Sequence, residues 1–108
     1  MKSLDSLFKI LTKDEKIFFN FMKGKYPVIQ NSNIFARDIQ YAIQTFFDRK
    51  DITVNYSDSE TLMKMFTDYL EKENKLTRLD KSAWKVNFSL ESNVESVGTN
   101  NDLKAKEF

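Results

Sequence analysis

The sequence predicts an α+β domain, mainly helical, in which three to four helices pack against a short antiparallel sheet that ends in a β-hairpin. Apolar residues recur at helical spacing along residues 57–74. The pattern then changes at once to strict alternation from Trp84 to Leu90, which is typical of a strand with one apolar face. Two Gly and one Pro in 108 residues also favour a helical chain with few tight turns.

Two helices are expected in the N-terminal part of the domain. Residues 3–11 place their apolar side chains on one helical stripe, and Thr12-Lys13-Asp14-Glu15 forms a capping box that predicts a boundary at Thr12. The next helix runs to Lys23, where Gly24 can cap it. Its apolar face is broad, so either the helix packs on two sides or Phe18 and Phe19 serve a partner.

A connection and a third helix follow. Residues 26–29 are compatible with a short edge strand that has Pro27 at its start. Residues 33–49 carry the clearest helical pattern. The apolar stripe of that helix is Phe35, Ile39, Ala42, Ile43, Phe46 and Phe47. Ile34 and Tyr41 are seven positions apart, so we expect both on the outer side of the helix with Gln40 and Gln44.

The central helix and the hairpin complete the domain. Residues 51–56 alternate as in a short strand, or form an extended loop. Ser57-Asp58-Ser59-Glu60 is a capping box, and Asn74 suits a left-handed cap at the other end of the helix. The hairpin pairs residues 76–79 with 84–90 around a turn at 80–82. Residues 1–90 are therefore expected to form a single domain, and residues 91–108, without periodicity, a disordered tail.

The run from Thr61 to Phe88, "TLMKMFTDYLEKENKLTRLD" followed by "AWKVNF", resembles the last helix and wing of a winged-helix domain. In that family the helix closes a helix-turn-helix, and the hairpin after it forms the wing. The resemblance implies a DNA-binding or DNA-associated accessory protein. The link before the helix is about twice the three or four residues of a compact helix-turn-helix, which is a departure from the pattern.

Composition limits the chemistry that we expect. The chain has no Cys and no His, so it lacks thiolate chemistry, the commonest general base and the commonest transition-metal ligand. With no Gly-rich phosphate loop either, we expect no enzyme, no metal, no cofactor and no small-molecule substrate. No apolar run is long enough to span a membrane, and the N-terminus lacks the apolar core of a signal peptide, which favours a cytoplasmic protein, or a nuclear one in a eukaryote.

The leading functional hypothesis is phosphate contact with double-stranded DNA through the last helix and wing. The residues expected to make it are Lys64, Lys75, Arg78, Lys81 and Lys85. The net charge is only +1, and the outer face of the helix also carries Glu60, Asp68 and Glu71, which would repel a phosphate backbone. A solvated face of ion pairs therefore explains the same helix. The densest positive run, Lys9 to Lys25, is a further candidate phosphate patch.

The alternative is a small protein–protein interaction module: an adaptor, an inhibitor or a self-associating domain. Its interface would be an exposed aromatic and apolar patch beside polar residues, as protein interfaces commonly are. The residues expected there are Phe19, Ile34, Arg37, Tyr41 and Gln44. Phosphate binding weakens steeply with salt and an apolar interface does not, so salt dependence separates the two hypotheses.

Overall fold

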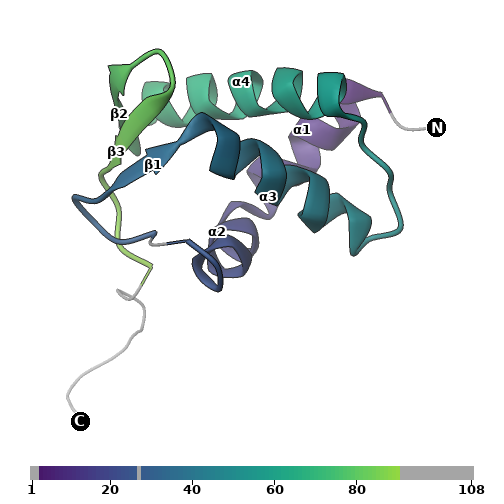
Figure 1. Cartoon of the computed structure of the whole chain (residues 1–108), viewed down its shortest axis with the longest axis horizontal. Coiled ribbons are helices and arrows are strands. Elements are labelled where there is room, and N and C mark those ends of the chain that lie inside the picture. The colour runs from purple at the N-terminus through teal and green to yellow at the C-terminus, as the bar shows by residue number, and fades with distance from the viewer. Residues whose placement is uncertain (1–2, 27, 91–108) are drawn as a thin grey trace, which may run out of the picture.

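The computed structural model describes residues 3–26 and 28–90 (Figure 1). The predicted tail at 91–108 lies outside the described residues. The elements are α1 (Leu4–Lys13), α2 (Glu15–Lys23), β1 (Asn33–Phe35), α3 (Ala36–Asp48), α4 (Tyr56–Lys72), β2 (Leu76–Asp80) and β3 (Ala83–Val86). The three strands form one antiparallel sheet in the order β1-β3-β2. The predicted α+β class, helices with a C-terminal hairpin, is confirmed.

Helices α1 and α2 meet at Asp14, two residues later than predicted. The Thr12 hydroxyl donates to the Lys9 carbonyl at 3.0 Å, so Thr12 stays inside α1 and caps nothing. The α1 N-terminus is capped by the Ser3 hydroxyl, which accepts from the Ser6 amide at 3.2 Å. Both Phe18 and Phe19 on α2 are buried, so the broad apolar face is explained by packing on two sides.

Strand β1 replaces the first turn of the predicted third helix. Asn33–Phe35 pair with Ala83–Lys85 of β3, and Ile34 lies opposite Trp84. Successive side chains in a strand point to opposite faces, which reverses the predicted roles of two residues. Ile34 is 3% exposed and Phe35 is 48% exposed, whereas a helix starting at Asn33 would have placed them the other way round. The strand predicted at 26–29 does not form at residues 28–29, and Pro27 lies outside the described residues.

An extended loop joins α3 to α4, so the strand alternative for residues 51–56 is wrong. Two amide side chains of α3 hold this loop. The Gln44 side chain donates to the Val54 carbonyl at 3.0 Å, and the Gln40 side chain donates to the Ser59 hydroxyl at 3.0 Å and the Tyr56 carbonyl at 3.2 Å. Gln40 is therefore buried rather than on the outer face.

The N-terminal cap of α4 lies two residues before the capping box predicted at Ser57. This cap is Asn55, whose side-chain oxygen accepts from the Asp58 amide at 2.8 Å. At the other end Asn74 has φ 61°, as predicted for a left-handed cap. Strand β3 ends at Val86, so the predicted strand to Leu90 is too long; Phe88 and Leu90 pack against the core beyond it.

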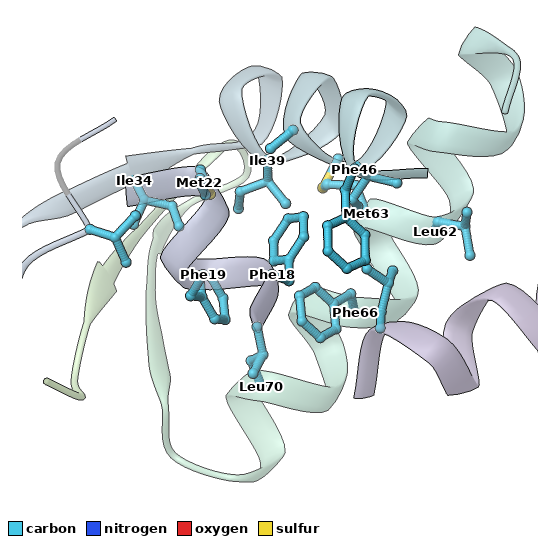
Figure 2. Close-up of a cluster of buried hydrophobic side chains, with 14 of the residues drawn as sticks. Phe18, Phe19, Met22, Ile34, Ile39, Phe46, Leu62, Met63, Phe66 and Leu70 are labelled. Carbon is cyan, nitrogen blue, oxygen red and sulfur yellow. The ribbon is translucent and has the colours of Figure 1, made fainter. Parts of the chain in front are cut away.

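Phenylalanine rings from three helices make the centre of the core (Figure 2). Phe18 of α2 lies edge-to-face with Phe19, Phe46 and Phe66, with ring centroids 5.3, 5.3 and 5.5 Å apart. Such pairs each contribute about 0.5–1.5 kcal/mol beyond the area that they bury. This cluster fixes α2, α3 and α4 relative to one another, and so fixes the surfaces between them.

Candidate functional site

The five cations predicted to contact DNA do not lie together. Lys75 at the end of α4 is tied to α2, because its ammonium donates to Oε2 of Glu15 at 2.7 Å. That hydrogen bond, aided by the attraction of the Glu15 charge, raises the pKa of Lys75 above its ordinary value, against an opposing effect of burial. The Lys75 ammonium therefore joins α2 to the connection between α4 and β2, and a phosphate contact would compete with this ion pair.

Arg78 on β2 is also engaged within the fold. Its guanidinium donates to Oε2 of Glu71 at 2.8 Å and lies 3.7 Å from Oδ1 of Asp68. The same guanidinium lies over the Trp84 ring, 5.1 Å from its centroid, and the Trp84 indole also donates to Glu71. Lys85 is half-buried in the central strand, where it pairs in register with Asn33 and Thr77. Arg78 and Trp84, through Glu71, position the hairpin on α4.

The other two predicted cations, Lys64 and Lys81, line one hollow. It lies between α3, α4 and the turn from β2 to β3, with a volume of about 460 Å³. We call this hollow the hairpin groove. Residues of the two competing hypotheses meet in it, because Arg37, Tyr41 and Gln44 line the same hollow. Figure 1 shows why: the hairpin lies beside one end of α4, where α3 begins.

The hairpin groove has a positive excess. Arg37, Lys64 and Lys81 come from three different elements, and none forms an ion pair with any residue in 3–26 or 28–90. The carboxylate that lines the groove is that of Glu60. Three cations against one carboxylate leave an anion-attracting surface, although the whole chain carries only +1.

Tyrosines add flat apolar surface beside these charges. Tyr41 is 49% exposed and Tyr56 is 71% exposed, and the buried side chain of Met63 on α4 lies in the wall of the groove. Sequence reasoning missed Tyr56, because residues 51–56 were considered as a strand or a loop. The Asn55 cap places Tyr56 on the first turn of α4 instead. The hydroxyl-bearing rings can contact either a sugar–phosphate backbone or a protein surface.

The predicted protein interface loses two of its five members. Phe19 is 1% exposed and packs against Phe66 and Phe88, with ring centroids 5.8 and 4.9 Å apart. Ile34 is buried against β3. Neither can take part in an exposed apolar patch, so that patch as predicted does not exist. Arg37, Tyr41 and the half-buried Gln44 remain on the surface, and all three line the hairpin groove.

No family model, curated protein or solved structure matches the chain. Within residues 3–26 and 28–90, no three His, Cys, Asp or Glu side chains gather in a way that could hold a metal ion. None of the helices in that part of the chain combines the length and the apolar character needed to cross a membrane.

Proposed function

We propose that the chain is a non-enzymatic DNA-binding module whose hairpin groove contacts the DNA duplex. The observation that carries this proposal is the convergence of Arg37, Lys64 and Lys81, without ion-pair partners in the described part of the chain, on one face. Half to two-thirds of protein–DNA hydrogen bonds go to phosphate and sugar, from such side chains and from Tyr, Gln and Ser. Tyr41, Gln44 and Ser82 supply those groups in the same groove.

The arrangement of helix and hairpin supports the same proposal. Lys64 lies on the helix and Lys81 in the turn of the hairpin after it. In the winged-helix domains that the chain resembles, the last helix and the wing are the two elements that approach the DNA backbone. Cations on both elements can therefore contact phosphates on one side of the duplex.

The carboxylates of α4 should repel DNA phosphates less than the sequence of the helix suggests. Of the three outward carboxylates, Glu71 accepts from Arg78 and Asp68 lies 3.7 Å from the same guanidinium. Arg78 thus offsets charge that would otherwise oppose an approaching phosphate backbone, at distances well within the screening length of about 8 Å. Glu60 is left as the groove carboxylate without a cation partner in the described ranges.

The test is fluorescence anisotropy with a labelled generic duplex, titrated at several salt concentrations. We expect binding whose affinity falls steeply with salt, and a slope of log affinity against log salt that drops by about 0.9 for each phosphate contact removed. Arg37→Ala, Lys64→Ala and Lys81→Ala should each reduce the slope by that amount. Lys72→Ala, an exposed α4 lysine outside the groove, is the matched control and should leave the slope unchanged.

Two results would refute this proposal. One is an absence of binding by the wild-type chain even at low salt. The other is a triple variant of Arg37, Lys64 and Lys81 that binds as tightly as the control. DNA binding would place the protein where DNA is, in the cytoplasm of a prokaryote or the nucleus of a eukaryote.

The exposed tyrosines support a second candidate, a protein-interaction module that uses the same groove. Tyr41 and Tyr56 form an exposed aromatic part of the groove that would contact a partner protein or a second copy of the chain. Light scattering over a range of protein concentrations tests self-association. A dimer that dissociates on Tyr56→Ala, but is insensitive to salt, would favour this candidate over DNA binding.

A further inference from the structure

A second hollow lies between the C-terminal end of α2 and the middle of α3. Its volume is about 440 Å³, within the range of about 300–1,000 Å³ that is usual for ligand sites. We call it the α2–α3 pocket. Three aromatic rings line it, those of Phe21, Tyr26 and Tyr41, together with the cations Lys25 and Arg49. No carboxylate is among its lining residues.

Both cations rest on aromatic rings. The Lys25 ammonium lies 4.9 Å from the Tyr41 ring centroid, and the Arg49 guanidinium lies 5.0 Å from that of Phe21. Contact with a ring face leaves N–H donors of Lys25 and Arg49 unused. Neither cation has a carboxylate within ion-pair distance in the described ranges. The two cations can therefore add an anionic group without breaking an existing ion pair.

The negative end of α2 opposes an anion here less than a bare helix end would. The Phe21 carbonyl accepts from the Gly24 amide at 3.2 Å, and the Met22 carbonyl accepts from the Lys25 and Tyr26 amides at 3.0 and 2.9 Å. These carbonyls at the end of the helix are thus satisfied by the chain itself. Lys25 and Arg49 dominate the local charge.

We propose that the α2–α3 pocket binds an organic anion with a flat apolar body. The body lies against Phe21, Tyr26 and Tyr41, and its carboxylate, phosphate or sulfonate group faces Lys25 and Arg49. Phe21 is fixed from behind by Phe46, with ring centroids 5.8 Å apart, so this wall is held by the core. The binding site is distinct from the hairpin groove, although Tyr41 lines both.

The first experiment is a titration of the folded chain with anilinonaphthalene sulfonate, followed by its fluorescence, in the absence of DNA. We expect saturable binding that 2-naphthoate and adenosine monophosphate displace to different extents, which separates carboxylate from phosphate ligands. Neutral 2-naphthamide should need at least a tenfold higher concentration than 2-naphthoate to displace anilinonaphthalene sulfonate. Equal displacement by the amide would overturn the proposal, as would a lack of saturable binding.

Variants locate the site. Lys25→Gln combined with Arg49→Gln should weaken binding at least tenfold, whereas Lys16→Gln, an exposed lysine of α2 outside the pocket, should not change it. Tyr41→Ala, at a half-exposed position outside the core, should weaken binding even if the double variant folds poorly. Amide shifts on ligand addition should centre on Gly24 and Thr45. Shifts elsewhere, or unchanged affinity in the variants, would refute the site.

Discussion

Trp84 donates its indole N–H to Oε2 of Glu71 at 2.9 Å, which joins the central strand of the sheet to helix α4. The same oxygen accepts from Arg78 at 2.8 Å, and the Arg78 guanidinium covers the Trp84 ring. Helix, outer strand and central strand thus meet at one carboxylate. This cluster sets the position of the hairpin, and with it the position of Lys81 beside the groove.

Removal of the Trp84 side chain should destabilise the domain strongly. Trp84 is fully buried, so Trp84→Ala should lower the free energy of unfolding by about 3–5 kcal/mol, measured by urea denaturation. Trp84→Phe keeps most of the apolar volume and loses the hydrogen bond to Glu71. Trp84→Phe should therefore lower the free energy of unfolding by less than Trp84→Ala does. An unchanged melting curve for Trp84→Ala would contradict the burial of this side chain.

Substitution of Arg78 should affect folding more than the electrostatics of binding. Arg78→Ala removes a partly exposed ion pair and a ring contact, and we expect a loss of about 1 kcal/mol in stability. The salt slope of DNA binding should change much less than it does in Lys64→Ala, because Arg78 makes no phosphate contact in the proposed complex. The affinity should fall slightly, because Glu71 and Asp68 lose the cation that offsets their charge. A slope reduced as much as that of Lys64→Ala would show that Arg78 contacts DNA after all.

The Lys75–Glu15 pair predicts a loss of stability at alkaline pH. The folded pKa of Lys75 is raised above 10.5, so the unfolded chain releases this proton at lower pH than the folded chain does. The pair therefore stabilises the fold fully at neutral pH, and its contribution is lost as the pH rises through the folded pKa. Between pH 8 and pH 11, the free energy of unfolding measured in urea should fall more for the wild type than for Lys75→Gln. Tyrosine ionisation affects both proteins alike, so the comparison removes it.

Neutralising Glu60 should strengthen DNA binding. Its carboxylate lines the same groove as Arg37, Lys64 and Lys81, where it would repel a phosphate in the proposed complex. Glu60→Gln should raise the affinity for a generic duplex by up to about fivefold at low salt, as expected for one exposed charge interaction. Glu73→Gln, at the far end of α4 and outside the groove, is the control. Weaker binding by Glu60→Gln would instead indicate that Glu60 accepts a hydrogen bond from a base.

The sequence predicted the long elements well and the short ones poorly. The helical pattern over 36–48 and 56–72 spans several turns, so it identifies helices whatever their ends are. Ile34 and Phe35 belong to a three-residue strand, which is too short to show a period of two. Only pairing with Trp84, distant in the chain, decides which of the two is buried.

Only part of the candidate site can be predicted from the sequence, for a related reason. Lys64 and Lys81 were predicted because they follow the pattern of helix and hairpin. Lys75 looked equivalent, but its partner Glu15 is 60 positions away, and no local pattern reports such a contact. Tyr56 and the α2–α3 pocket depend on how helices pack, which the period of one helix does not specify.

The strand order β1-β3-β2 also dictates when the fold can be completed during translation. Strand β3 comes last among the strands of residues 3–26 and 28–90, yet it is the one with which β1 and β2 both pair. Until Val86 has left the ribosome, β1 has no neighbour and Ile34 has no strand to lie against, although helices α1 to α4 have already been synthesised. A released chain truncated before Ala83 should therefore be protease-sensitive at β1, whereas a chain truncated after Leu90 should be protected there.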